Sequence, residues 1–269
     1  MRLYRIGEFA KKLGVTPDFL KYCEKNGLIT TSPGENGTRC YDFTQAARIL
    51  EYIKLRNQGY SAQDIVRMTT ATPFAENLEN VREKDEELRV QALYLDHVQR
   101  HHKLMYEQKD YFHTSRWLLG EHQGFYFLPH TKGHDFLEDP VIPELVSKWT
   151  PYMPVVMSAY QDIPGQNGIL PRKSSDSIWG LMVEEDFARG AGLPVEEPVI
   201  HIPPGLYLEA FCLSSLEKGA SYETDPMEQI NQLLARIGLK PRGAAYAQIL
   251  AKLVEDGKRV CYSRVFVPV

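Results

Sequence analysis

The feature that most constrains the fold of this chain is an ordered series of helix and turn signals between residues 4 and 68. The series opens with YRIGEFAKKLGVTPDFLKYCEKNGLIT, runs through the turn-rich link TSPGENGTRCYDFT and closes with QAARILEYIKLRNQGYSAQDIVRM. Apolar residues recur at helical spacing in the first and last runs, whereas Pro-Gly and Asn-Gly pairs interrupt the link. The pattern predicts two short helices, a small hairpin and a second helix pair.

Local residues also predict where these helices begin and end. Gly14 ends the first helix because glycine readily takes a positive φ, while Thr16 and Pro17 open the second as N-cap and first helical residue. Thr44 is expected to cap the third helix, and Ser61 the fourth. Two helices joined by a tight turn and followed by a hairpin form a winged helix-turn-helix, which places one helix where it can enter a DNA major groove.

The distribution of charge supports contact with nucleic acid. Residues 1–70 contain eleven Lys or Arg and seven Asp or Glu, a net charge of +4. The whole chain carries −4, so residues 71–269 carry −8. A basic module attached to an acidic remainder is the electrostatic pattern of a domain that meets phosphates. The alternative is a small helical bundle whose lysines are simply solvated.

The first seventy residues resemble the DNA-binding domain of the MerR family of transcription regulators. The matching motifs, in order, are YRIGEFAKKLGV, LKYCEKNGLI, RCYDF and LRNQGYSAQDI. The resemblance implies phosphate contacts from Tyr22 in the recognition helix and from Arg39 and Tyr41 in the wing. The full set of residues expected at the DNA is Thr16, Asp18, Lys21, Tyr22, Arg39 and Tyr41.

Three positions of the recognition helix depart from that family or have an open role. Lys21 stands where the family usually has Arg, which keeps the charge but loses the planar guanidinium fork. Cys23 stands where a second Tyr is common, so one aromatic contact is missing. Asp18, on the exposed first turn, could accept a hydrogen bond from a cytosine amine, or only favour the helix N-terminus.

A long helix is expected next, since residues 74–119 contain neither Pro nor Gly. Apolar residues spaced four and three apart form a stripe along this helix, which Asp85 interrupts at one position. The stripe consists of Leu78, Val81, Leu88, Ala92 and Leu95. The intervening residues are mostly charged, so the stripe needs a partner. A coiled-coil homodimer provides one, and the MerR resemblance implies antiparallel pairing; the alternative is a helix packed on its own C-terminal domain. A twofold dimer would read a pseudo-palindromic promoter.

Residues 120–269 are expected to form a further domain, after a DNA-binding domain at 1–72 and a dimerisation helix at 73–119. Its expected elements form a strand-helix-strand-strand unit twice, at 125–129, 143–149, 155–160 and 178–184, then at 199–213, 227–237, 244–253 and 260–267. Two such units predict an α+β fold, an antiparallel sheet with helices on one face and a cleft between the halves. This order, with IPPGLYLEAF and SRVFVPV, resembles the GyrI-like effector domains, which sense drugs in some MerR relatives.

An acid between aromatic residues suggests a ligand for this domain. Tyr207, Glu209 and Phe211 alternate along one expected strand and therefore share one face of the sheet. A lipophilic cation would be attracted by aromatic faces, and the carboxylate would offset the cost of desolvating its charge. The candidate ligand-binding residues are Trp149, Tyr152, Tyr160, Trp179, Glu184, Tyr207, Glu209, Tyr222 and Tyr246. The alternative is that the aromatic residues form the core.

Neither a metal nor another cofactor is expected. The four cysteines are far apart and form no CxxC motif, which argues against a zinc site or an iron–sulfur cluster. His97 and His101 share a helix face, but no Cys or carboxylate completes the set at a convincing spacing. The chain shows no signal peptide and no apolar run long enough to span a bilayer, so we expect a cytoplasmic protein.

Three classes of function compete. The best supported is a ligand-responsive transcription regulator that binds promoter DNA as a homodimer and senses a hydrophobic, cationic small molecule or drug. The MerR resemblance implies an activator that distorts a promoter with an overlong spacer, so that RNA polymerase can engage both elements. The alternatives are a constitutive DNA-binding protein and a small-molecule hydrolase, in which Glu209 or Glu184 would act with Tyr262. We expect no enzymatic activity, because the chain has no Gly-rich phosphate loop and no nucleophile elbow.

Overall fold

The computed structural model describes residues 2–34, 38–114, 116–165, 168–171, 177–215 and 226–269. The chain divides into two compact units, Met1–Leu88 (unit 1) and Arg89–Val269 (unit 2), and the division falls within the long helix α5 (Phe74–Glu107). Among the described residues, none of the helices combines the length and the apolar character needed to cross a membrane.

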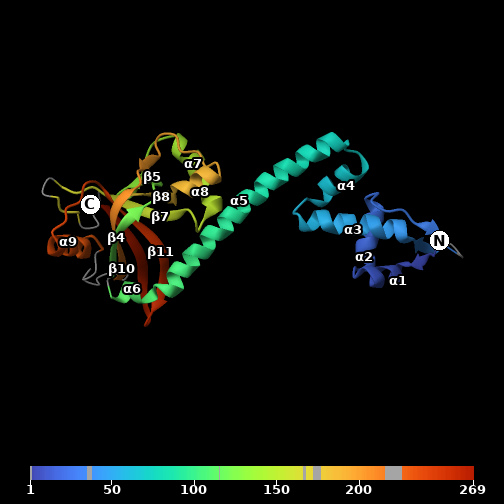
Figure 1. Ribbon diagram of the computed structural model, residues 1–269, viewed down its shortest axis with the longest axis horizontal. Helices are drawn as coiled ribbons and strands as arrows, with labels where there is room; N and C mark the ends of the chain where they lie inside the picture. Colours follow the sequence, from blue (N-terminus) through green and yellow to red (C-terminus); the bar gives the residue numbers. More distant parts are fainter. Residues whose placement is uncertain (1, 35–37, 115, 166–167, 172–176, 216–225) are drawn as a thin grey trace. The chain divides into compact units, whose positions relative to one another are not determined.

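Unit 1 is built from short helices and a small sheet (Figure 1). Its elements before α5 are β1 (Tyr4–Arg5), α1 (Ile6–Leu13), α2 (Pro17–Lys25), β2 (Ser32–Pro33), β3 (Arg39–Tyr41), α3 (Phe43–Asn57) and α4 (Ala62–Thr70). The three strands form an antiparallel sheet in the order β1-β3-β2. The two helix pairs and the strands between them follow the order that the sequence predicts.

The helix ends show why this order can be read from the sequence. Gly14 follows α1 with a φ of 67°, and the Thr16 hydroxyl accepts a hydrogen bond of 3.1 Å from the Phe19 amide at the start of α2. Ser61 caps α4 in the same way, since its hydroxyl accepts from the amide of Asp64 at 3.1 Å. These predicted ends are confirmed, because each depends on a contact between residues close together in the chain.

The start of α3 differs from the prediction that Thr44 would be its N-cap. Asp42 is the N-cap, and its carboxylate accepts hydrogen bonds from the amides of Thr44 and Gln45 at 2.9 and 3.3 Å. The helix therefore begins earlier than expected, because an aspartate two residues before the threonine caps at least as well.

The core of unit 1 connects its helices to its small sheet. Leu20 of α2, Ile49 of α3 and Ile65 of α4 are fully buried in one cluster. Tyr41 of β3 belongs to the same cluster and stacks on Phe9 of α1, with ring centroids 4.9 Å apart. Burial of this kind, and not helix propensity alone, holds such short helices in place.

The long helix ends earlier than predicted. α5 stops at Glu107, and a short helix α6 (Lys109–His113) and a strand β4 (Trp117–His122) replace the rest of the expected helix. The strand pairs with a later strand of the chain, and Phe112 of α6 packs edge-on against Phe211 with ring centroids 5.4 Å apart. Long-range pairing and burial therefore outweigh the absence of Pro and Gly in this stretch.

Unit 2 contains an antiparallel sheet with helices packed on it (Figure 1). Its further elements are β5 (Phe125–Lys132), β6 (Asp135–Phe136), α7 (Val141–Trp149), β7 (Met157–Asp162), β8 (Ile178–Glu184), α8 (Glu185–Gly190), β9 (Ile200–Ile202), β10 (Gly205–Ser215), α9 (Pro226–Ile237), β11 (Ala245–Glu255) and β12 (Lys258–Pro268). The strand order is β4-β10-β12-β11-β7-β8-β5-β6, with β9 paired to β5.

The sheet contains the expected strand-helix-strand-strand unit twice. The first consists of β5, α7, β7 and β8, the second of β10, α9, β11 and β12, and the two meet where β7 pairs with β11. The single strand expected at 199–213 is divided into β9 and β10, because Pro203 and Pro204 lie between them and proline cannot donate to a ladder.

Different helices cover the two faces of this sheet. Leu208, Ala210 and Cys212 of β10 belong to the cluster on which α9 packs. Glu209 and Phe211 lie on the opposite face of the strand, as the alternation predicts. That second face meets α6 at Phe211 and the end of α5 near the middle of the sheet.

The second half of α5 is attached to unit 2 by hydrogen bonds. The guanidinium of Arg89 donates to the carbonyl of Gly190 at 2.7 Å, and the hydroxyl of Tyr94 donates to the carbonyl of Met153 at 2.9 Å. Gly190 is the last residue of α8, and Met153 lies in the turn that follows the short helix Thr150–Tyr152. This part of the helix is therefore an element of unit 2.

Opposite sides of α5 make different contacts between residues 88 and 98. The side that meets unit 2 consists of Leu93, Tyr94, His97 and Val98. The other side consists of the stripe residues Leu88, Ala92 and Leu95, of which the two leucines are 42% and 51% exposed. At about 100° per residue the two sets point in opposite directions. A partner along the stripe would therefore leave the contacts with the sheet intact.

Candidate functional site

The residues of α2 that are predicted to meet DNA lie on its exposed side. They are Tyr22, Lys21, Asp18 and the N-cap Thr16. Lys21 donates a hydrogen bond of 2.9 Å to the carboxylate of Asp18, and this contact lowers the pKa of Asp18. Lys21 must exchange that exposed ion pair before it can bind a phosphate, which costs little because the pair is solvated.

Strand β3 contains two of the residues predicted to meet DNA, one exposed and one buried. The Arg39 side chain is 61% exposed, and its Nε lies 3.8 Å from a carboxylate oxygen of Glu24. Tyr41 is fully buried, and its hydroxyl donates to Glu24 at 3.0 Å. Burial and this hydrogen bond raise the pKa of Tyr41 to about 12. In the free chain the hydroxyl of Tyr41 is therefore directed into unit 1, where it holds β3 to α2 and is not exposed for the predicted phosphate contact.

Unit 2 contains a cavity of about 200 Å³ on the face of the sheet that α5 meets. Its lining residues are His97, Arg100, His101 and Leu104 of α5, Val155, Met157 of β7, Glu184 of β8, Gln248 of β11 and Arg264 of β12. One wall of the cavity is thus a helix, and the floor is formed by neighbouring strands from both halves of the sheet. Both apolar and charged side chains line it.

An imidazole lies between two carboxylates at this cavity. His97 is 5% exposed, with its Nδ1 3.4 Å from Glu184 Oε2 and its Nε2 3.7 Å from Asp186 Oδ2. The hydrogen bond with His97 lowers the pKa of Glu184, although burial acts in the opposite direction. Among the described residues, Nε2 of His97 has no hydrogen-bond partner. The imidazole of His97 therefore has one nitrogen in contact with a carboxylate and one nitrogen without a hydrogen-bond partner among the described residues.

Glu209 is a second buried acid, and its carboxylate contacts two side chains, His122 and Arg264. One oxygen lies 2.9 Å from Nε2 of His122, and the other accepts a hydrogen bond from Nε of Arg264. Burial would raise the pKa of Glu209, but these hydrogen bonds and charges lower it to about 2. The guanidinium of Arg264 also lies 4.6 Å from the ring centroid of Phe266. In the single chain Arg264 therefore holds the position at Glu209 that a cationic ligand is predicted to take.

Most of the aromatic residues predicted to bind a ligand belong to the core. Trp149 is fully buried, and its indole nitrogen donates to a backbone carbonyl at 3.0 Å. The hydroxyls of Tyr207 and Tyr246 are hydrogen-bonded inside unit 2. The others that pack in or against core clusters are Tyr152, Tyr160 and Trp179. Large rings are buried readily once their polar atoms are satisfied. Glu184 is the member of the predicted set that lines the cavity, and Tyr222 lies outside the described residues.

The acid–phenol pair of the hydrolase alternative is not formed among the described contacts. The hydroxyl of Tyr262 donates to Glu255 at 3.0 Å, and burial together with this acid raises the pKa of Tyr262. Glu209 is paired with Arg264 and Glu184 with His97. In the described structure each of these two acids therefore has a partner other than the phenol.

Sequence reasoning places His97 and His101 on one helix face but misses that they line a cavity with Glu184 and Arg264. The four-residue spacing of His97 and His101 is visible in the sequence, as is the acidic run at 184–186. Nothing in the sequence indicates that these two segments meet, because one belongs to α5 and the other to the junction of β8 and α8, far away along the chain. The carboxylates that the isolated histidine pair lacks come from this second segment.

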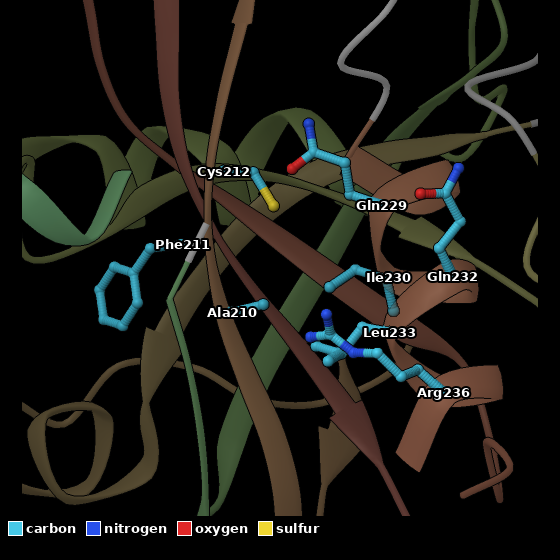
Figure 2. Close-up of a pocket in the computed structure, with 8 residues that line it drawn as sticks. All are labelled: Ala210, Phe211, Cys212, Gln229, Ile230, Gln232, Leu233 and Arg236. Carbon is cyan, nitrogen blue, oxygen red and sulfur yellow. The ribbon is translucent and has the colours of Figure 1, made fainter. Parts of the chain in front are cut away.

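A second cavity, of about 330 Å³, lies on the other face of the sheet between α9 and β10 (Figure 2). Ala210 and Cys212 are directed toward α9, whereas Phe211 is directed away from it. The helix contributes Gln229, Ile230, Gln232, Leu233 and Arg236. The described residues that line this cavity include none of the predicted ligand-binding residues and none from α5.

Comparison with known protein families assigns the N-terminal region. Residues 4–72 match the family described as MerR HTH family regulatory protein. This range contains β1 to β3 and α1 to α4, so the N-terminal part of unit 1 is a MerR-type helix-turn-helix, and the match supports a DNA-binding regulator. No protein with curated annotation matches the chain.

Likenesses to solved structures are weaker. A MerR family transcriptional regulator from Bacillus cereus is 20% identical, over 40% of this chain and 84% of its own, with a TM-score of 0.35. The EcmrR–DNA complex in EcmrR-RPo is 15% identical, over 98% of each chain, with a TM-score of 0.36. A hydrolase from Listeria innocua is 12% identical, over 60% of this chain and 97% of its own, with a TM-score of 0.33. TM-scores this low do not establish a shared fold or function.

Proposed function

We propose that the chain is a DNA-binding transcription regulator that acts as a homodimer and responds to a small effector bound in unit 2. The observation that carries the proposal is the match of residues 4–72 to the MerR HTH family, in a unit whose helix α2 has an exposed polar side. Helix-turn-helix proteins read DNA by placing such a helix in the major groove. The chain is then a binding protein and not an enzyme.

Helix α2 and strand β3 supply the proposed DNA contacts. Lys21 and Arg39 would bind phosphates, and Tyr22 would add a hydroxyl donor to the backbone. Asp18, on the first turn of α2, would face base edges once Lys21 moves from it to a phosphate. Thr16 fixes the start of the helix through its hydrogen bond to the backbone. Phosphate contacts of this kind position the protein, and base contacts then select the sequence.

The exposed stripe of α5 supports a homodimer. Its large residues Leu78, Val81, Leu88 and Leu95 are 47%, 49%, 42% and 51% exposed in the single chain. Apolar side chains at this spacing on a mostly charged helix need a covering surface. A second copy of the chain provides an identical stripe, and the twofold dimer would bind a pseudo-palindromic promoter.

The cavity beside α5 is the proposed effector site. Glu184 offers a carboxylate there, and Leu104, Val155 and Met157 offer apolar surface. The two arginines of the lining are paired with other acids, Arg100 with Asp96 and Arg264 with Glu209, so we propose that the cavity takes a small cation. The volume is about 200 Å³, below the roughly 300–1,000 Å³ of pockets for drug-sized ligands. A bulky hydrophobic cation of the multidrug type would therefore have to displace side chains of α5, whereas a compact cation would not.

Regulation requires that the effector bind one state of the protein better than another. Because α5 forms a wall of the cavity, an effector in the cavity contacts the dimerisation helix directly. We propose that the favoured state bends and untwists promoter DNA, with the deformation energy of the DNA as the opposing term. RNA polymerase would then engage both promoter elements, which makes the protein an activator.

DNA binding by the full-length protein tests this proposal. Duplexes are selected from a randomised pool, and the affinities of the wild type and Arg39→Ala are measured by fluorescence anisotropy at several salt concentrations. Arg39→Ala should weaken binding to selected and unselected duplexes alike. It should also reduce the slope of log K against log salt by about 1, because one phosphate contact is lost. A change of sequence preference alone would assign Arg39 to a base instead.

Arg67→Ala is the matched control for this experiment. Arg67 of α4 is 57% exposed and lies 3.6 Å from Asp64, so it resembles Arg39 in exposure and pairing, but it is outside α2 and β3. Its replacement should leave the affinity and the salt slope unchanged. If the wild-type protein enriches no duplex from the pool, the proposed function is rejected.

A further inference from the structure

We infer that unit 2 binds one divalent first-row transition metal ion, of the Zn²⁺ type, between His97 of α5 and Asp186 of α8. Nε2 of His97 and Oδ2 of Asp186 would coordinate the ion, while Glu184 orients the imidazole from its Nδ1 side. This position adjoins the proposed effector cavity, which His97 and Glu184 line, and the inference names an effector class for it. Its regulatory consequence rests on the proposed function, whereas the binding itself does not.

The chemistry and spacing of these donor atoms fit such an ion. Imidazole and carboxylate are both ligands of Zn²⁺ and of its neighbours in the first row. A tetrahedral ion with bonds of about 2.0–2.1 Å places two ligand atoms about 3.3 Å apart. Nε2 of His97 and Oδ2 of Asp186 are 3.7 Å apart. A movement of roughly half an ångström therefore brings both atoms to coordination distance.

The state of His97 is a second observation that points to a ligand. Its side chain is 5% exposed, and its Nε2 has no hydrogen-bond partner among the described residues. A buried polar atom without a partner is rare because it loses its contact with water and gains nothing in return. The Glu184 carboxylate on Nδ1 has the arrangement by which proteins orient a metal-bound histidine. One donor atom from each of the three residues lies within 4.8 Å of the others.

Neighbouring side chains are compatible with a bound cation. His101 lines the same cavity one helical turn further along, and its buried Nδ1 also has no hydrogen-bond partner among the described residues. It lies outside the group of donor atoms within 4.8 Å of one another, so we assign it no bond to the ion. Arg100 competes for Asp186, at 3.9 Å, but its guanidinium also pairs with Asp96 at 2.5 Å. Arg100 can therefore remain on Asp96 when an ion takes Asp186.

A proton is the competing occupant of this position. A protonated His97 would interact with Glu184 and Asp186 without any metal. Loss of function on replacement of His97 would fit both occupants, so it does not separate them. Direct measurement of metal binding does separate them, because only one of the two occupants is a metal ion.

The test uses full-length protein that has been stripped with a chelator and dialysed. Co²⁺ is titrated at neutral pH while its visible absorption is followed, and Zn²⁺ is then added to displace it. We expect about one equivalent per chain, displaced by Zn²⁺ but not by Mg²⁺, which prefers octahedral oxygen sites. Affinities for Zn²⁺ are measured by competition with a chromophoric chelator.

Substitutions of the three residues should have graded effects. Glu184→Gln should weaken Zn²⁺ binding about 10–100-fold, the usual effect of removing a carboxylate that orients a metal-bound histidine. His97→Gln and Asp186→Asn should weaken it at least as much, because each removes a ligand. Asp186 is only partly buried, so Asp186→Asn tests the site even where His97→Gln impairs folding.

His113→Gln is the matched control. His113 also lies near a carboxylate, 3.3 Å from Glu255, but its side chain is 47% exposed and does not line the cavity. This variant should bind Zn²⁺ as the wild type does. Tryptophan emission and circular dichroism, recorded for each variant, check that the fold is retained.

Two results would overturn the inference. One is a wild-type protein that binds no stoichiometric ion, and the other is wild-type affinity in both His97→Gln and Asp186→Asn. DNA binding, measured on the same samples, separates this failure from that of the proposed function. DNA binding without metal binding rejects the metal site alone, and metal binding without DNA binding rejects the regulator.

Discussion

The DNA-facing side of unit 1 and the cavity of unit 2 are built in opposite ways. The exposed residues proposed to meet DNA lie between Thr16 and Arg39, on one helix and one strand that are close together in the chain. The cavity brings together His97, Glu184 and Arg264 from a helix and two strands that are far apart in the chain. The first surface exists once local elements have formed, whereas the second requires the complete sheet.

The same contrast governs the charged groups. Asp18 pairs with Lys21 at an exposed position, where an ion pair contributes little to stability. Glu209 pairs with Arg264 and His122 inside unit 2, where removal of one partner leaves a buried charge. Substitutions in unit 2 should therefore change stability strongly, and those on the DNA-facing side should change mainly binding.

Trp149→Ala should give the largest effect and would sharpen this contrast. Trp149 is fully buried, so its truncation should lower the free energy of unfolding of unit 2 by about 3–5 kcal/mol through lost burial and a residual cavity. Urea unfolding followed by emission of the remaining Trp117 and Trp179 measures this. Val254→Ala, at a position 69% exposed in the same unit, should stay within about 0.5 kcal/mol of the wild type. Equal effects of the two changes would contradict the core assignment.

The pH dependence of stability should show the buried pair of Glu209. Its pKa is about 2 in the folded chain, against a reference of 4.5, so its contribution is complete above pH 4.5 and is lost as pH falls toward 2. The contribution amounts to roughly 3 kcal/mol, since one pKa unit corresponds to about 1.4 kcal/mol. Urea unfolding between pH 6 and pH 3 should show a shallower loss of stability in Glu209→Gln than in the wild type. If the stability of the two proteins fell in parallel with pH, the assignment of Glu209 to a buried ion pair would be contradicted.

Thr16→Ala should have a smaller effect that is confined to unit 1. The hydroxyl of Thr16 caps α2, and loss of such a cap costs about 1 kcal/mol. The three tryptophans are at positions 117, 149 and 179, so their emission reports on unit 2, while circular dichroism also reports on the helices of unit 1. We expect the loss of stability to appear in the unfolding transition followed by circular dichroism, with no change in the transition followed by tryptophan emission. A shift of the tryptophan transition instead would show that the two units do not unfold separately.

The parts that the sequence predicts correctly depend on local physics. Gly14, Thr16 and Ser61 mark helix ends through contacts within a few residues, and the structure confirms each of them. The alternation along β10 likewise places Glu209 on the expected face, because period-two patterning needs no knowledge of the partner strand. In both cases the information is contained in a short stretch of the chain.

The parts that could not be predicted depend on which distant segments meet. The sequence predicts a longer helix than α5 because β4, which replaces its end, forms only by pairing with β10. The pairing of Glu209 with Arg264 cannot be seen in the sequence of either strand alone. The motif around Tyr41 likewise gives no sign that its hydroxyl donates to Glu24. In each case a long-range contact decided the outcome.

The two-sided use of α5 bears on how such a protein could diverge after gene duplication. Leu88 and Leu95 point to one side of the helix, and Tyr94 and His97 point to the other. Oppositely charged substitutions along the first side of two copies could make them pair only with each other. The second side of each copy would be free to acquire a different effector. A heterodimer of this kind would combine two chemical signals at one promoter.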